Sequence, residues 1–104
     1  MDHAVIAHLR LSDRGFGSDS EREAIFLLEE RLVAAIERAH AGELDGNEFG
    51  GGECTLYMYG PDADALYNAV VPVLQMNPLA RGGYAVKRYG DARDPNAREV
   101  RVAW

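Results

Sequence analysis

Segments of alternating apolar residues are interleaved with two segments whose apolar residues recur at helical spacing, and this order limits the possible folds. The stretch Val5–Leu11 has the period of two that is typical of a strand with one buried face. The stretch from Ile25 to Ala39 has the spacing of an amphipathic helix. The chain therefore begins with a predicted strand followed by a predicted helix.

Polar residues define the expected ends of this first helix. Two capping-box patterns precede it, Ser18 with Glu21 and Ser20 with Glu23, and both start positions stay open. Gly42 is placed to end the helix in a left-handed conformation.

The rest of the chain repeats the pattern. Strands are predicted at Leu44–Phe49 and Cys54–Tyr59, and a hairpin is predicted from Tyr84–Tyr89 and Glu99–Trp104. A second helix is expected after Gly60, with Pro61 at its first position, Pro72 kinking or shortening it, and Asn77-Pro78 ending it.

The resulting order β-α-β-β-α-β, with one extra strand at the end, is that of a ferredoxin-like α+β sandwich. A chain of 104 residues suits a single domain, which we assign to residues 1–104. Right-handed crossovers place the first and third strands side by side in an antiparallel sheet. Both helices then cover one face of the sheet, and the other face is left open.

Composition limits the partners. The formal net charge is −6 and the pI about 4.9, which argues against nucleic acid and permits a basic protein partner. The single cysteine, Cys54, excludes an intramolecular disulfide and fits a reducing compartment. We expect no signal peptide, no membrane span and a cytoplasmic location.

Neither a cofactor nor a metal is expected. The glycine-containing loop before the first helix leads into Asp19, Glu21 and Glu23, whose charges repel a phosphate. No spacing of cysteine, histidine and carboxylates resembles a zinc or calcium site. Cys54 is predicted to face the core and His8 the open face, which disfavours a Cys–His nucleophile pair.

The open sheet face is the predicted binding surface, because it combines tyrosines with cationic side chains. It could pack against a second copy of the chain, hold a ligand or another protein, or be solvated. The predicted binding residues, the last three on the assumption that Ala85, Lys87 and Tyr89 point outward, are His8, Arg10, Thr55, Tyr57, Tyr59, Lys87, Tyr89 and Arg101.

Three stretches of the sequence carry a resemblance: Gly42-Glu-Leu-Asp-Gly46, Cys54-Thr-Leu-Tyr-Met-Tyr-Gly-Pro-Asp-Ala-Asp64 and Pro78-Leu-Ala-Arg-Gly-Gly83. In these stretches the chain resembles a small bacterial family of uncharacterised proteins. The resemblance implies a bacterial cytoplasmic protein and supplies no catalytic residue. The Gly-Glu-x-Asp-Gly pattern is also similar to one in the acidic protein inhibitors of ribonuclease E, which implies an acidic domain that binds an enzyme.

The sequence thus favours a non-catalytic binding domain that forms a homodimer through its open face. One alternative is a small enzyme in which His8 and Tyr57 or Tyr59 act as acid and base at a sheet-to-sheet interface. The other is an acidic inhibitor or immunity-type protein that binds a basic enzyme through Glu43, Asp45, Glu48 and Glu53.

Overall fold

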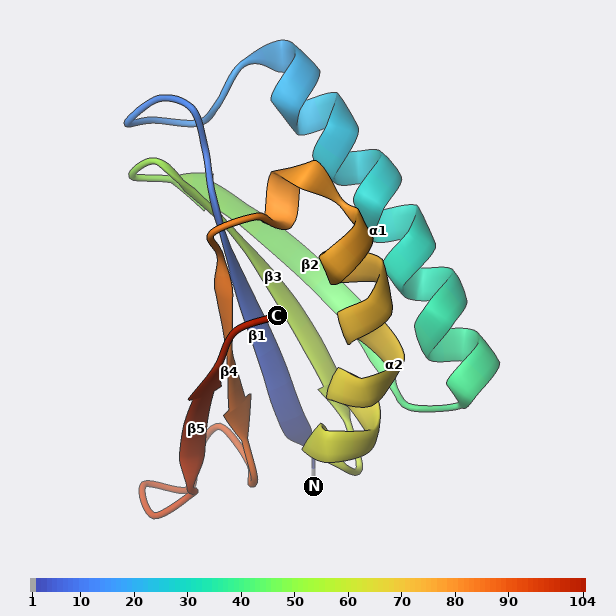
Figure 1. The fold of residues 1–104 in the computed structure, drawn as a ribbon. Coiled ribbons are helices and arrows are strands. Elements are labelled where there is room, and N and C mark those ends of the chain that lie inside the picture. The colour runs from blue at the N-terminus through green and yellow to red at the C-terminus, as the bar shows by residue number, and fades with distance from the viewer. Residues whose placement is uncertain (1) are drawn as a thin grey trace.

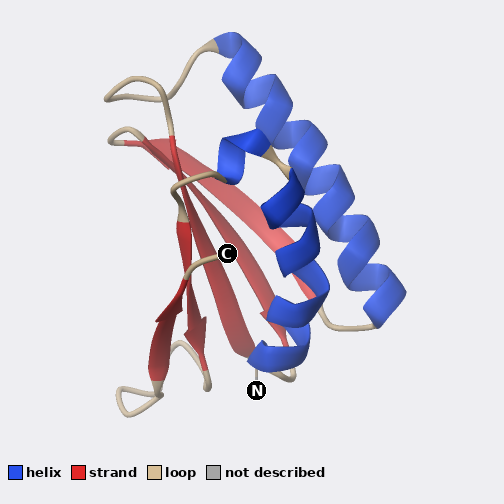
Figure 2. Ribbon diagram, viewed as in Figure 1, coloured by secondary structure: helices blue, strands red, loops and turns tan. Residues whose placement is uncertain are grey.

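Five antiparallel strands form one sheet, and two helices cover one of its faces (Figures 1 and 2). This computed structural model describes residues 2–104. The α+β class and the antiparallel sheet are as expected. The elements are β1 (His3–Arg10), α1 (Asp19–Ala39), β2 (Glu43–Gly50), β3 (Glu53–Gly60), α2 (Ala63–Met76), a short 3-10 helix (Pro78–Ala80), β4 (Tyr84–Arg88) and β5 (Glu99–Val102).

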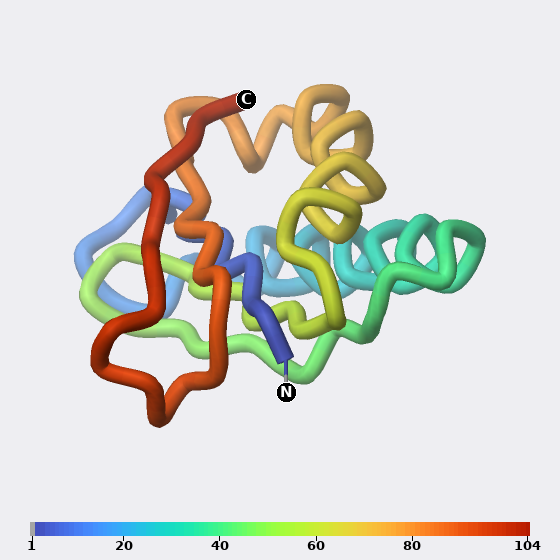
Figure 3. The backbone as a smooth tube through the Cα atoms, turned by 90° about the horizontal axis from the view of Figure 1, so that it is seen from below, coloured from blue at the N-terminus to red at the C-terminus, as the bar shows by residue number. Residues whose placement is uncertain are grey.

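The strands lie in the order β2-β3-β1-β4-β5, so β1 pairs with β3 on one side and β4 on the other. The predicted contact between the first and third strands is confirmed. The arrangement is consistent with the ferredoxin-like type, and β5 adds an edge strand beside β4. Figure 3 shows this last segment running next to β4 at the margin of the sheet.

Helix α1 begins with one of the two predicted capping boxes. The Ser18 hydroxyl accepts from the backbone of Glu21, and the Glu21 carboxylate accepts from the backbone of Ser18. Ser20 lies inside the helix. The predicted end at Gly42 is wrong by two residues, because His40 (φ 50°) is the left-handed residue that caps the helix.

Helix α2 differs from the prediction at its start. Asp62 caps the helix, accepting from the backbone of Asp64 and Ala65, so Pro61 precedes the helix instead of opening it. Pro72 lies inside α2 and does not shorten it. The last residue of the helix is Met76, and Asn77, where the sequence predicted the end, caps it.

The last hairpin is shorter than predicted. β4 ends at Arg88 and β5 at Val102, which leaves Tyr89 and Trp104 outside the strands. The Trp104 side chain folds back instead, and its indole Nε1 donates to the Ala80 carbonyl at 2.8 Å. This bond ties the end of the chain to the 3-10 helix.

The core lies between the sheet and the helices. Alternate residues of β1 and β3, among them Leu9 and Leu56, are fully buried against the apolar stripe of α1 and α2. The buried stripe of α1 consists of Ile25, Leu28, Leu32 and Ile36. All of these side chains point to the side of the sheet on which both helices lie, and the other face has no helix over it.

Two glycines allow the α1–β2 connection to cross the end of β3. Gly42 has φ +141°, and a Cβ built on it would lie 1.9 Å from the Tyr59 carbonyl oxygen. A Cβ on Gly60 would lie 2.0 Å from the Ala41 carbonyl oxygen. The two backbones can therefore approach each other only because both side chains are absent.

We expect Gly42→Ala to lower the free energy of unfolding by about 2 kcal/mol or more, because the added Cβ meets fixed backbone at a positive φ. Urea denaturation measures this loss. Gly46→Ala is the matched control, since no atom lies within 4 Å of its Cβ position, and it should change stability by less than about 1 kcal/mol. Equal losses in the two variants would contradict this account of the crossing.

Candidate functional site

The sheet face that turns away from the helices, called the open face here, has neither helix over it (Figure 1). Cross-strand partners share a face, so the strand register assigns each side chain to a side. The open face carries Glu43 and Glu48 of β2, Glu53, Thr55, Tyr57 and Tyr59 of β3, Ile6, His8 and Arg10 of β1, Tyr84, Val86 and Arg88 of β4, and Glu99 and Arg101 of β5.

Six of the eight predicted binding residues share this face. His8 pairs with Thr55, and Arg10 lies two residues further along β1. Tyr57 and Tyr59 are half-buried and follow Thr55 on the same side of β3. Arg101 reaches the open face from β5, through its pairing with Val86.

Lys87 and Tyr89 do not lie on the open face, and the assumption that they point outward is wrong. Lys87 pairs with Val5, whose side chain is buried under the helices. Its Nζ lies 2.9 Å from Asp64 of α2, and the Tyr89 hydroxyl donates to the same carboxylate oxygen at 2.5 Å. Hydrogen bonds from Tyr89 and Lys87 lower the pKa of Asp64. These side chains therefore join β4 to α2.

The register brings in residues that the sequence prediction missed. Tyr84, Val86 and Arg88 replace Ala85, Lys87 and Tyr89 as the outward side chains of β4. The one feature of the sequence that indicates which side of β4 is buried is Ala85, a small residue that lies fully buried between sheet and helix. The acidic-inhibitor alternative placed Glu53 with the carboxylates that bind a basic enzyme, and the structure pairs it with His8.

A hollow of about 260 Å³ lies at one end of the open face, where β1 ends. Its walls include His8 and Arg10 of β1, Glu53 of β3, Tyr84 of β4 and Arg101 of β5, together with two glycine turns, at Gly51–Gly52 and Gly82–Gly83. The hollow thus collects side chains from four strands. Three of the predicted binding residues, His8, Arg10 and Arg101, meet in it.

Stacking and a hydrogen bond hold the side chains of this hollow. The His8 ring stacks on Tyr84 with 4.7 Å between centroids, and its Nδ1 lies 2.9 Å from Glu53 Oε1. The Arg101 guanidinium lies 3.7 Å from the centroid of Tyr84. His8 and Arg101 reach Tyr84 from the strands on either side of β4, so the tyrosine ring positions both.

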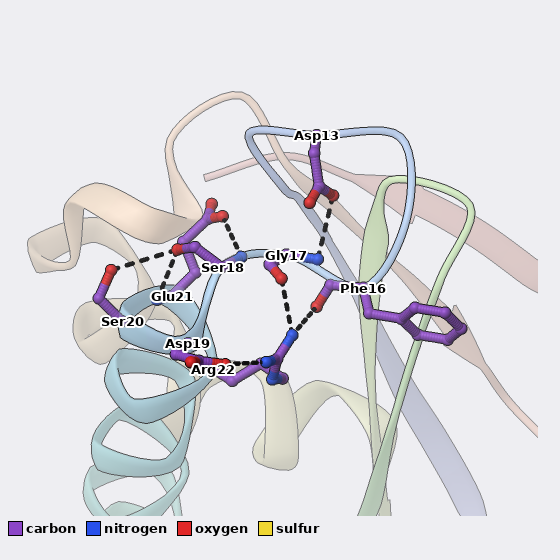
Figure 4. A network of polar contacts seen from close by, with 8 residues as sticks. All are labelled: Asp13, Phe16, Gly17, Ser18, Asp19, Ser20, Glu21 and Arg22. Atoms are coloured by element: carbon purple, nitrogen blue, oxygen red, sulfur yellow. Dashed lines mark hydrogen bonds and ion pairs between the residues drawn. The ribbon is translucent and has the colours of Figure 1, made fainter.

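The loop between β1 and α1 supports one wall of the hollow. The backbone of Leu11 donates to Gly52, and Gly52 in turn donates to Gly15, which fixes the β2–β3 turn against the loop. Side chains hold the loop itself, as Figure 4 shows: Asp13 accepts from the backbone of Gly17, and Arg22 donates to the Gly17 carbonyl.

Glu21 closes this network from the first turn of α1. Its carboxylate accepts from the hydroxyl and the backbone of Ser12 and from the backbone of Ser18. These hydrogen bonds, the one from the Ser12 side chain first, lower the pKa of Glu21 from 4.5 to about 2. The loop therefore depends on an ionised carboxylate.

Cys54 faces the core as predicted, on the side of the sheet opposite to His8. Burial, with a smaller contribution from Glu29, raises the pKa of its thiol to about 12. Burial also raises the pKa of Tyr57, with Glu48 adding to the shift. Neither side chain is prepared to act as a base near neutral pH.

Within residues 2–104, no cluster of three or more histidine, cysteine or carboxylate side chains is arranged to hold a metal ion. No helix in this part of the chain combines the length and apolarity needed to cross a membrane. Comparisons with protein-family models, curated proteins and solved structures find no match.

The depressed pKa of Glu21 predicts a pH dependence of stability. Ionised Glu21 stabilises the fold fully above pH 4.5, the value of its ordinary pKa, and this contribution is lost as the pH falls toward about 2. The difference in free energy of unfolding between wild type and Glu21→Gln should therefore shrink as the pH is lowered, measured by urea denaturation at several pH values.

The control for this experiment is Glu23→Gln. The Glu23 carboxylate is exposed, lies two residues further along the same helix and, within residues 2–104, forms no side-chain hydrogen bond. Its difference from wild type should change little with pH. A Glu21→Gln difference that stays constant over the same range would contradict the role given to the carboxylate.

Native Cys54 should resist alkylation. At pH 8 a thiol with a pKa of about 12 is almost entirely protonated, so we expect labelling by iodoacetamide on the order of 100-fold slower than in urea-unfolded protein. Mass spectrometry of timed samples measures both rates. Rapid stoichiometric labelling of the folded protein would contradict the burial of this side chain.

Proposed function

We propose that this protein is a non-catalytic binding domain that associates with a second copy of itself through the open face. We also infer that the fold is ferredoxin-like, with β5 added at the edge. The order β2-β3-β1-β4 and the placement of both helices on one side support this assignment. In such a sandwich the uncovered sheet face is the natural contact surface, as expected for a single layer of strands.

The observation that carries the proposal is a strip of half-buried apolar and aromatic side chains across the three central strands. Ile6, Tyr57, Tyr59 and Val86 form this strip. Tyrosine is enriched at protein interfaces because it combines a large apolar area with a polar end. A second sheet packed on the strip would remove this area from water.

The charges beside the strip favour a second copy as the partner. The β2 edge carries exposed Glu43, Asp45 and Glu48. On the open face, β4 and β5 carry Arg88 and Arg101 and one carboxylate, Glu99. A two-fold axis parallel to β1 lays the β2 edge of one copy over the β4–β5 side of the other. The opposite charges then face each other in both halves of the interface.

The register identifies one pair for a direct test. Glu43 pairs with Tyr59, Tyr59 with Ala4 and Ala4 with Arg88, so all lie in one cross-strand row. Three strand spacings separate Glu43 from Arg88 within one copy, or ~14 Å. Rotation about a two-fold axis that runs midway between β3 and β1 keeps the row and brings Glu43 of one copy over Arg88 of the other.

We expect sedimentation equilibrium to detect a dimer at tens of micromolar, weakened at least ~10-fold by Glu43→Lys or by Arg88→Glu. The double variant should recover most of the affinity, because both intermolecular pairs are restored with reversed sign. The double variant Tyr57→Ser with Tyr59→Ser should also weaken association while circular dichroism shows an intact fold.

Glu30→Lys provides the control, since it makes the same charge change on an exposed position of α1. It should leave association unchanged. Wild-type protein that stays monomeric at tens of micromolar would overturn the proposed dimer. If the double variant Glu43→Lys with Arg88→Glu does not recover affinity, the proposed axis is overturned.

A small enzyme is the second candidate, and the His8–Glu53 hydrogen bond at 2.9 Å is the observation that favours it. A carboxylate that orients an imidazole is a common arrangement for a general base. The side chains that hydrogen-bond to His8 or stack on it are Glu53 and Tyr84, in place of the Tyr57 or Tyr59 that the sequence suggested. The acidic-inhibitor alternative would use exposed Glu43, Asp45 and Glu48, without Glu53.

A further inference from the structure

The hollow at the end of β1 gathers positive charge in a protein whose net charge is negative. Two guanidinium groups and an imidazole line it, from Arg10, Arg101 and His8. Its one carboxylate, Glu53, is already engaged by His8. The formal net charge of the whole chain is −6, so a cationic hollow is not a consequence of the average composition.

Both arginines of the hollow have unused hydrogen-bond donors. Within residues 2–104, neither Arg10 nor Arg101 donates a hydrogen bond or forms an ion pair, whereas Arg22 does both. Arg101 is held only by its stacking on Tyr84. A guanidinium that stacks on a ring keeps the N–H groups at its edge available for an oxyanion.

Preorganisation favours binding over a loose charge pair. The stack of His8, Tyr84 and Arg101 fixes two of the three nitrogen-bearing groups before a ligand arrives. The glycine turns contribute backbone and no side chains to the walls, so the volume of about 260 Å³ stays accessible. This volume is somewhat below the usual range for drug-sized ligands, which indicates a compact molecule.

We propose that the hollow formed by His8, Arg10, Tyr84 and Arg101 binds the oxyanion group, phosphate or carboxylate, of a compact ligand. Arg10 and Arg101 donate charge-assisted hydrogen bonds to the oxyanion. Tyr84 keeps the Arg101 plane in place, and Glu53 and His8 complete the wall. All of its groups come from one copy of the chain, so ligand binding does not need the self-association proposed above, and Arg101 is the residue that the two proposals share.

The proposal is tested by titrating isotope-labelled protein with inorganic phosphate, with citrate and with sodium chloride at matched ionic strength. Phosphate or citrate should cause saturable shifts at millimolar concentration, concentrated in the backbone amides of Gly51, Gly52, Gly82 and Gly83. Saturation by phosphate alone identifies a phosphate ligand, and saturation by citrate alone identifies a carboxylate ligand. Shifts that do not saturate, or that sodium chloride reproduces, overturn the proposal.

Substitution provides the second arm. Arg101→Gln and Arg10→Gln should each weaken binding ~10-fold or more, because each removes charge-assisted hydrogen bonds. Arg31→Gln, an exposed position on α1, is the matched control and should bind as wild type. Equal affinity in Arg101→Gln and Arg31→Gln would overturn the assignment of the site.

The same titration on the Glu43→Lys variant separates the two proposals. Glu43 lies on β2, outside the hollow, so anion binding should persist in this variant whether or not it dimerises. Loss of dimerisation with retained anion binding would support the hollow as proposed. Loss of anion binding with retained dimerisation would overturn the proposed anion site and leave the proposed dimer standing.

Discussion

The antiparallel pairing of β1 with both of its neighbours is the constraint on which the rest of the structure depends. In a sheet covered on one side, a shift of one residue would turn every side chain to the opposite face. Val5, Ala7 and Leu9 are fully buried under the helices, and this burial fixes the register of β1. Through β1 it also fixes which side chains of β3 and β4 are available on the open face.

The two faces of the sheet differ in how their polar side chains are bonded. On the covered face, Asp64, Lys87 and Tyr89 use their polar ends to join β4 to α2. On the open face, polar groups such as those of Arg10 and Arg101 keep unused donors. Polar side chains on the covered face therefore stabilise the fold, whereas Arg10 and Arg101 on the open face keep donors that the fold does not use.

Several features of the fold could be predicted from the sequence because local physical chemistry dictates them. The alternation in β3 and the apolar stripe of α1 are periodic over enough residues to define their buried sides. The capping box of Ser18 and Glu21 depends on contacts within one turn. The central position of β1 follows from the handedness of the two crossovers.

The outward side of β4 could not be predicted in the same way. Tyr84–Tyr89 alternates apolar and polar residues too weakly to show which set is buried, and only the pairing of Ala85 with Ala7 decides it. The partnership of Glu53 with His8 and the stacking of Arg101 on Tyr84 likewise join residues from different strands.

By itself, then, the sequence determined the order of strands and helices, the inward position of Cys54 and an open face containing His8, Arg10, Tyr57 and Tyr59. Only the tertiary structure moved Lys87 and Tyr89 to the covered face and gathered Arg10, Tyr84 and Arg101 around one hollow. The physical reason is that periodicity acts along a segment, whereas contacts between strands depend on register. Register is set by burial across the whole sheet.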